Sequence, residues 1–159
     1  MNGVLNWFGI EGLNWLGDPN LAMLSIIIMS VWAGFGYNMV IFIAGLAGIP
    51  DSLYEAASID GANKWTCFWK VTLPMLSPTM FFAVIMTIIS SFQVFDQAFI
   101  MTSGGPFNAT NTIVYYIYQN GFEFFRMGYA SAIAWVLFVI IFIVTLIQMK
   151  IQKRWVHYE

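Results

Sequence analysis

The sequence predicts an all-α membrane protein, a polytopic helical bundle with about three transmembrane helices. Hydrophobic residues make up 60% of the 159 residues, and charged residues make up only 9%. A typical soluble domain carries about 25% charged residues and about half apolar ones. Since so few charges could not cover a globular core with a solvated surface, we expect the apolar surplus to face lipid.

Three long stretches without Asp, Glu, Lys or Arg predict the individual helices; they cover residues 21–50, 71–95 and 127–149. Each exceeds the roughly 20 apolar residues that a helix needs to cross a bilayer. Because a backbone in lipid must satisfy its own hydrogen bonds, helices are expected rather than strands. We place the spans near residues 22–46, 76–97 and 128–149. The first exceeds a straight crossing, and a bend or an early end is expected at its glycines: Gly34, Gly36, Gly45 and Gly48.

The remaining bulk properties exclude several classes of protein. A net charge of −2 argues against nucleic-acid binding, which requires a basic surface. The single cysteine, Cys67, permits no intrachain disulfide or Cys-rich metal site, and we expect it to be a small buried hydrophobe. Met1 is followed by a stretch with Glu11 and Asp18 rather than by basic residues, so no secretory signal peptide is expected.

The basic residues predict the orientation in the membrane. Two lie between the first two spans and three follow the third: Lys64 and Lys70, then Lys150, Lys153 and Arg154. Three spans put both segments on one side, which the positive-inside rule makes cytoplasmic, together with the C-terminus. Arg126 is the exception, and residues 1–20 and 96–126 are expected outside. Five side chains predict an aromatic belt at that external face: Trp7, Trp15, Tyr115, Tyr116 and Tyr118.

The segment between spans one and two predicts a short helix with clear ends. Ser52 and Glu55 have the spacing of an S-x-x-E capping box, so the helix should start at Leu53. Gly61 stands where a left-handed residue would end it. Alanines on its surface suit insertion into a groove on a partner protein. An ordinary loop that packs on its own protein is the alternative interpretation, and the residues by themselves leave both open.

A second helix is predicted from about residue 62 to 72, before Leu73-Pro74 leads into span two. Its Trp65, Phe68 and Trp69 recur at i, i+3 and i+4, which places them on one face. Such an apolar stripe suits a helix that lies in the membrane interface, in contact with lipid.

A run of residues at fixed spacings resembles the EAA loop of ABC importer permeases, EAA-x3-G-x9-I-x-LP. The run is Glu55-Ala56-Ala57, three residues, Gly61, nine residues and Val71-Thr72-Leu73-Pro74. It differs from the family pattern only in having Val71 where the family has Ile.

Neighbouring motifs resemble the sugar-importing subgroup, the maltose and glycerol-3-phosphate permease-like family. They are Ile49-Pro50, Ile59-Asp60-Gly61-Ala62, Phe95-Asp96, Thr102-Ser103-Gly104-Gly105-Pro106 with Thr110, and Gly128-Tyr129-Ala130. The similarity runs from about Asn14 to Glu159. We therefore expect residues 1–159 to form one transmembrane permease domain, the C-terminal portion of the family domain.

The resemblance implies a permease subunit of a binding-protein-dependent ABC importer, a multi-pass protein of the bacterial cell membrane. In such importers two permeases, here expected to form a heterodimer, surround the path of a sugar or sugar derivative. Cytosolic ATP-binding subunits dock beneath them, and an extracytoplasmic solute-binding protein delivers the sugar. Carried over by position, five residues would form or shape the ATPase contact: Glu55, Ala56, Ala57, Asp60 and Gly61.

The chain itself carries no phosphate-binding loop ending in Gly-Lys-Ser/Thr, so we expect no enzymatic activity, no cofactor and no metal. It departs from the family in length. Family members usually have six or more spans, whereas about three are predicted here. We therefore expect the chain to be a fragment, or to begin at a misplaced start, with the spans that precede Asn14 in the family absent.

Polar side chains within or at the ends of the spans are candidates for the substrate path: Asn38, Ser91, Gln93 and Asp96, with Ser90 and Gln97 beside them. Polar residues at membrane depth tend to face a bundle interior or a pathway, and sugar hydroxyls need neutral donors and acceptors. Hydrogen bonding between helices is the alternative for the amides and hydroxyls. For Asp96, the alternative is an interfacial capping role at the end of span two.

Residues 102–112, rich in Gly, Thr and Asn, predict an external turn. It either meets the solute-binding protein or is a tight turn that needs Gly at positive φ.

Two other classes of membrane protein stay open. An ion-coupled or facilitative secondary carrier would place charged coupling residues near the bilayer midplane, and the predicted spans carry none there. A non-transporting permease fragment is the other possibility. Dependence of uptake on ATP would separate an importer from a carrier, and co-purification with partners would separate both from a fragment.

Overall fold

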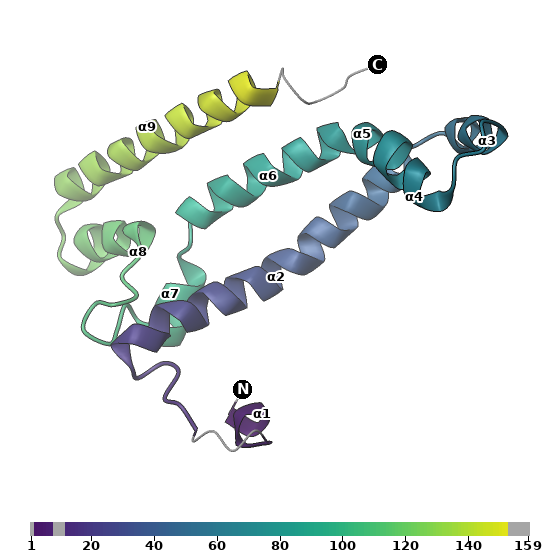
Figure 1. Cartoon of the computed structure of the whole chain (residues 1–159). Helices are drawn as coiled ribbons and strands as arrows, with labels where there is room; N and C mark the ends of the chain where they lie inside the picture. The colour runs from purple at the N-terminus through teal and green to yellow at the C-terminus, as the bar shows by residue number, and fades with distance from the viewer. Residues whose placement is uncertain (1, 8–11, 153–159) are drawn as a thin grey trace. The chain divides into compact units, whose positions relative to one another are not determined.

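The computed structural model describes residues 2–7 and 12–152, and in this part of the chain every regular element is a helix (Figure 1). The α-helices are α1 (Asn2–Trp7), α2 (Pro19–Ala47), α3 (Asp51–Ile59), α4 (Lys64–Cys67), α5 (Leu73–Met75), α6 (Ser77–Phe92), α7 (Asp96–Thr102), α8 (Ile113–Tyr118) and α9 (Met127–Gln152). Wider π-helical turns, η1 (Phe68–Thr72) and η2 (Gln119–Glu123), continue α4 and α8. The predicted all-α class is confirmed, while Lys153 and Arg154 lie outside the described residues.

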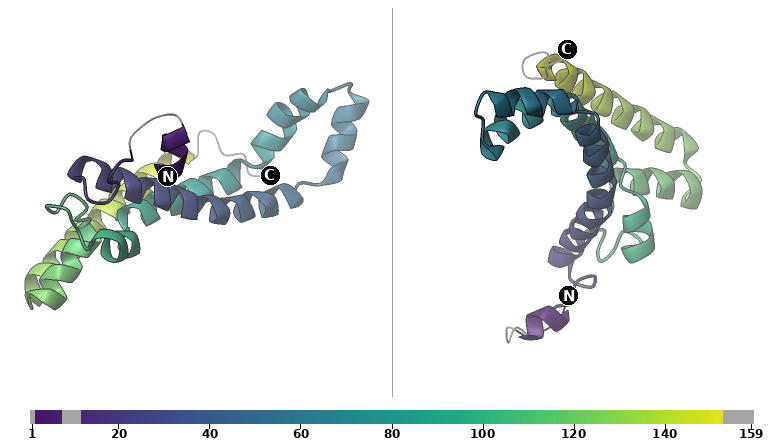
Figure 2. Two further views of the ribbon diagram at one scale, coloured as in Figure 1. Left: turned by 90° about the horizontal axis from the view of Figure 1, so that it is seen from below. Right: turned by 90° about the vertical axis from the view of Figure 1, so that its right-hand side faces the viewer.

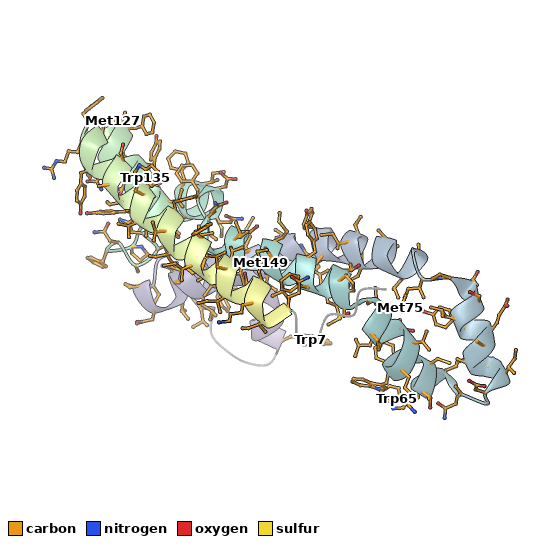
Figure 3. The ribbon with its side chains drawn as sticks, turned by 90° about the horizontal axis from the view of Figure 1, so that it is seen from above. Trp7, Trp65, Met75, Met127, Trp135 and Met149 are labelled. Carbon is orange, nitrogen blue, oxygen red and sulfur yellow. The ribbon has the colours of Figure 1, made fainter. Side chains whose placement is uncertain are left out.

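Helices α2 and α9 are long and apolar enough to cross a membrane, with 29 and 26 residues. At 1.5 Å per residue, each is roughly 40 Å long, which exceeds the roughly 30 Å hydrocarbon core. They confirm the spans predicted near residues 22–46 and 128–149. Helix α2 runs through Gly34 and Gly36 without interruption and ends at Ala47, next to Gly48. Large apolar side chains on both helices are exposed, including Trp32 and Trp135, the latter labelled in Figure 3.

The second predicted span, near residues 76–97, begins at a break in the helix. The helical run Lys64–Met75 and helix α6 meet at an angle of 60° and would together count as one span. Pro78 explains the break, because proline fits the first turn of a new helix but not a helix interior.

The predicted end of this span near residue 97 is wrong, since α6 ends at Phe92. The Val94 carbonyl oxygen accepts a 2.7 Å hydrogen bond from the Thr112 hydroxyl rather than from a helical N–H. Asp96 then begins the separate helix α7.

The chain divides into two compact units. The first consists of Met1–Trp32 and Gln93–Ala134, and the second consists of Ala33–Phe92 and Trp135–Glu159. The long helices α2 and α9 therefore each contribute residues to both units.

The first unit has a core of Ile26, Ala98 and Tyr115, and further aromatic rings pack around it. Phe95 stacks on Phe99 with ring centroids 5.3 Å apart, and the Tyr118 ring meets Phe95 at 5.3 Å. The segment expected to be an external loop is thus folded into α7, α8 and η2. Tyr115 is 3% exposed and Tyr118 is half-buried, so the prediction of belt residues is wrong at these two positions, which fill the core instead.

In the second unit, α2 lies close to the start of α6. A Cβ atom on Gly45 would come within 2.7 Å of Oγ1 and 2.8 Å of Cγ2 of Thr79. Helices α3 to α5 connect the end of α2 to the start of α6, as both views of Figure 2 show. Cys67 in α4 is half-buried and free, not a fully buried hydrophobe as expected, because α4 is short and mostly exposed.

Candidate functional site

The candidate site is helix α3 with the turn that follows it. The helix begins at Asp51, with Pro50 as its N-cap at φ −63° and ψ 133°. The negative charge of Asp51 lies in the first turn, where the helix dipole favours it. The predicted capping box is wrong, because no side chain caps this end. Ser52 lies inside the first turn, since the proline sets an extended residue and starts the helix two positions earlier than expected.

The end of α3 is a Schellman turn centred on Gly61. Asp60 is the C-cap, and Gly61 adopts φ +77° as predicted. The N–H of Ala62 donates to the Ala57 carbonyl oxygen at 2.9 Å, and the N–H of Gly61 donates to the Ser58 carbonyl oxygen at 3.0 Å. A Cβ on Gly61 would meet no atom within 4 Å. Glycine is therefore favoured here by backbone conformation and not by lack of space.

One face of α3 is exposed and the other is not. Exposed side chains recur at the helical spacing i, i+3, i+4 and i+7: Ser52, Glu55, Ala56 and Ile59. Ile59 is 86% exposed, a large value for an isoleucine. Half-buried side chains lie on the opposite side: Leu53, Tyr54 and Ala57. Of the predicted coupling residues, Glu55, Ala56, Asp60 and Gly61 are exposed, whereas Ala57 is half-buried and contributes its carbonyl oxygen to the turn.

The following helical run starts two residues later than predicted, at Lys64, because Asn63 caps it. The Asn63 side-chain oxygen accepts the Thr66 N–H at 2.8 Å. Asn is a favoured N-cap, so this signal was available in the sequence. The run continues through Pro74, since the wider turn η1 ends at Thr72, two residues before this proline. A proline in a regular helix would clash with the carbonyl four residues earlier, and a π-turn relieves that clash.

The predicted aromatic stripe on this run is present. The Trp65 ring lies 6.1 Å from Phe68 and 5.8 Å from Trp69, between ring centroids. Trp65 is 70% exposed and Trp69 is 51% exposed, and Figure 3 marks Trp65 on α4.

The four candidate substrate-path residues lie in both units. In the second unit, the Asn38 amide nitrogen reaches Thr87 Oγ1 at 3.5 Å, while its buried Oδ1 has no hydrogen-bond partner. Ser91 donates to the Thr87 carbonyl of its own helix at 2.8 Å. The contact between Asn38 and Thr87 fits the alternative of hydrogen bonding between helices.

Gln93 and Asp96 are exposed residues of the first unit. The alternative role for Asp96 was to cap the end of span two. This prediction is wrong, because α6 already ends at Phe92 and Asp96 lies in the first turn of α7. No three His, Cys, Asp or Glu side chains in the described part of the chain are placed to hold a metal ion.

The segment of residues 102–112 is a turn in which the hydroxyl of Thr110 binds within the segment. Thr110 is fully buried, and its hydroxyl donates to the Gly105 carbonyl oxygen at 2.7 Å. The Thr102 and Thr110 hydroxyl oxygens are 2.6 Å apart. Gly104 has φ +79°, as expected for a tight turn. Sequence reasoning missed the aromatic cluster beside this turn, although the spacings of Phe95 with Phe99 and of Tyr115 with Tyr118 were a helical signal.

The chain is similar to transport proteins in sequence, and a solved transporter structure has a similar fold. The family described as binding-protein-dependent transport system inner membrane component matches residues 3–157. The chain is 46% identical over 162 residues to the probable ABC transporter permease protein YesP of Bacillus subtilis (strain 168), a match that covers 100% of this chain and 52% of that protein. It is 41% identical over 153 residues to the sulfoquinovosyl glycerol transport system permease protein SmoG of Agrobacterium fabrum, covering 96% of this chain and 50% of that protein.

The chain spans about half the length of these curated relatives. Among solved structures, a chain of a bacterial ABC transporter involved in the import of the acidic polysaccharide alginate has the same fold, with a TM-score of 0.82. That likeness has 24% sequence identity and covers 96% of this chain and 54% of the other. The chain therefore belongs to the family of binding-protein-dependent transport system inner membrane components, which are transporter permeases and not enzymes.

Proposed function

We propose that this chain forms part of the solute path of an ABC importer and couples that path to a cytosolic ATP-binding subunit through α3. Membership of the permease family supports the transport function. A sugar or sugar derivative is the proposed solute, because the relative SmoG is named for the transport of sulfoquinovosyl glycerol. Proposed further partners are an extracytoplasmic solute-binding protein and a second, different permease.

The observation that carries the coupling proposal is the exposed face of α3. An exposed isoleucine beside a small alanine leaves an apolar surface that a partner can cover. Exposed carboxylates flank that surface at Asp51, Glu55 and Asp60. The matching groove on a partner would have an apolar floor for Ile59 and Ala56, with basic side chains at its rim.

The orientation of the chain follows from its charges. Lys64, Lys70 and Lys150 support a cytoplasmic position for α3, for the start of α6 and for the end of α9. The exposed aromatic rings of Trp65 and Trp69 support contact between α4–η1 and the lipid headgroup region.

For the solute path, Asn38 is the strongest of the four candidates. Its Oδ1 is buried and lacks a protein partner in the described residues. A buried amide oxygen without a partner has an unmet hydrogen bond that a sugar hydroxyl can supply. Ser91, Gln93 and Asp96 remain predictions for the same path.

The test is co-purification in mild detergent with a candidate cytosolic ATP-binding subunit expressed together with the chain. The wild-type chain should retain this subunit, and the double variant Glu55→Ala with Gly61→Glu should lose it. The matched control makes the same two chemical changes elsewhere, as Glu123→Ala with Gly128→Glu. Both control positions are exposed, and a Cβ on Gly128 would meet no atom within 4 Å.

Retention by the wild type and by the control, with loss from the double variant, would support docking through α3. Equal retention by all three would show non-specific association and contradict the coupling proposal. Loss from the control as well as from the double variant would place the contact outside α3.

A further inference from the structure

Helix α3 is held at both ends and also along its length. The link 48–50 joins it to α2, and the turn at Gly61 joins it to α4. Between these two ends, the Tyr54 hydroxyl lies 3.1 Å from Thr72 Oγ1 in η1. The hydrogen bond connects residues that are 18 positions apart in the chain. It therefore closes a ring made of α3, the glycine turn, α4 and η1.

This hydrogen bond is partly buried. Thr72 is 9% exposed, and Tyr54 lies on the half-buried side of α3. In such surroundings water competes poorly for either hydroxyl, so the bond holds a defined geometry. Tyr54 is also outside the exposed row of Glu55, Ala56 and Ile59.

Thr72 lies just before span two and is buried. Its carbonyl oxygen accepts the N–H of Leu76 at 2.9 Å, where the chain bends by 60° into α6. Leu76 and Thr79 are the side chains that a Cβ on Gly45 of α2 would meet, at 3.0 Å and 2.7 Å. A force applied to α3 and resisted at Thr72 therefore reaches α6 and α2 through packed contacts.

The π-helical turn sets the direction of Thr72. A π-turn contains one residue more than an α-turn, and single π-turns occur frequently at functional sites. Each residue advances an α-helix by about 100°. Without the extra residue, Thr72 would point about a quarter-turn away from its present direction, and Tyr54 could not reach it.

We propose that Tyr54 and Thr72 form a brace that fixes the angle of α3 and so transmits motion of the ATP-binding subunit to the membrane helices. This inference rests on the proposed function. Without the brace, α3 would pivot at the link 48–50 and at Gly61 when its partner moves. The ATP-binding subunit would still dock on α3, but its motion would rotate α3 and would not reach the membrane helices. Tyr54 is thus a positioning residue that acts through α3.

The first arm of the test measures the brace on the purified chain alone. Tyr54→Phe and Thr72→Val each remove one hydroxyl and keep the side-chain shape. Hydrogen exchange of the amides of α3 and of its C-terminal turn, including Asp60 and Ala62, should become about five-fold faster in either variant, the order expected for one lost hydrogen bond. The double variant should exchange no faster than the single variants, because both remove the same bond. Tyr37→Phe on α2 is the matched control and should leave exchange unchanged.

The second arm measures coupling in the complex with the ATP-binding subunit. Val84 is an exposed residue of α6, so a fluorophore at Val84→Cys, with Cys67→Ser to remove the native thiol, reports on the span. Addition of a non-hydrolysable ATP analogue should change this signal in the wild type and in Tyr37→Phe. In Tyr54→Phe the change should be smaller, while the amount of retained ATP-binding subunit stays the same.

Exchange in Tyr54→Phe that equals the wild type, or effects of the two substitutions that add, would overturn the brace. Loss of the ATP-binding subunit from Tyr54→Phe would also overturn it, because Tyr54 would then belong to the docking surface. Failure of the wild type to retain the subunit contradicts the proposed function instead. The exchange measurement, which needs no partner, then still decides whether the bond braces α3.

Discussion

Two turns of the chain share one backbone conformation and differ in everything around it. Gly61 after α3 has φ +77°, and Gly104 after α7 has φ +79°. A Cβ on Gly61 would meet no atom within 4 Å, whereas a Cβ on Gly104 would lie 2.5 Å from Cε1 of Tyr115. The second turn is filled by the chain's own side chains, and the first is open. An open turn beside an exposed helix face leaves room for another protein.

The hydroxyl groups around the two turns show the same difference. After α7, the Thr110 hydroxyl binds within the turn and the Thr112 hydroxyl binds Val94. Around α3, the Tyr54–Thr72 hydrogen bond holds the inner side while the outer side stays exposed. The hydroxyls of Thr110 and Thr112 are thus bound within the first unit. In the region 48–76, one face of α3 stays exposed.

The largest effect is expected from Gly104→Ala, which tests whether the turn after α7 is filled. The new methyl group would both strain a left-handed residue and press on the Tyr115 ring. We expect a loss of about 3 kcal/mol in unfolding free energy, the sum of a left-handed strain and an overpacking term. Thermal unfolding in detergent would measure it. If Gly104→Ala lowered the unfolding free energy by less than Gly61→Ala does, the contrast between the filled and the open turn would be contradicted.

A smaller effect is expected from Gly45→Ala, which tests the packing of α2 on α6 beneath α3. The methyl group would meet the Thr79 side chain and should destabilise by about 1–2 kcal/mol after the gain in helix propensity. Gly34→Ala on the same helix is the matched control, because it meets no atom within 4 Å. It should be neutral or stabilising, by up to about 1 kcal/mol. If the unfolding free energy changed in the same direction in both variants, close packing at Gly45 would be contradicted.

Gly61→Ala should cost less still, about 1 kcal/mol, because only the backbone conformation resists it. Gly61→Asn should cost less than Gly61→Ala, since Asn tolerates the left-handed region better. Thermal unfolding measures both variants. A loss as large as that of Gly104→Ala would show that the turn at Gly61 is packed rather than open.

The smallest effect concerns the buried Tyr115. Burial, with a further contribution from the negative charge of Glu123, raises the pKa of Tyr115 above its usual value of 10.0. The neutral phenol is favoured in the folded chain, so its contribution to stability is complete below the unfolded pKa. That contribution is lost as the pH rises through the raised pKa. An ultraviolet titration should show a late-titrating tyrosine component that becomes smaller in Tyr115→Phe. An unchanged titration in that variant would contradict the assignment.

Local patterns in the sequence were enough to predict much of the fold. Long uncharged runs predicted α2 and α9, and the position of Gly61 predicted the end of α3. A break between the second helix and span two was expected at Leu73-Pro74, but the helical run continues through Pro74 and the break lies at Leu76. The end of α6 was missed because the Val94 carbonyl binds Thr112, which is distant in sequence. Tyr115 was wrongly placed in an aromatic belt. Its burial depends on contacts with Ile26 and Ala98 of other helices, which the local sequence does not reveal.

For the candidate site, the family resemblance predicted the contact residues but not which side of α3 is open; they are Glu55, Ala56, Ala57, Asp60 and Gly61. The half-buried position of Ala57 and the bond from Tyr54 to Thr72 arise from the return of the chain through η1. No local pattern contains that return, because it depends on a π-helical turn ahead of Pro74.

The central claim is that the outer face of α3 is the docking surface, and site-specific photo-cross-linking tests it most directly. A photoreactive residue at Ile59, on that face, should cross-link to the ATP-binding subunit. The same group at Phe107, which is 92% exposed in the turn after α7, should not. A cross-link from Phe107, or none from Ile59 when the subunit co-purifies, would contradict the account.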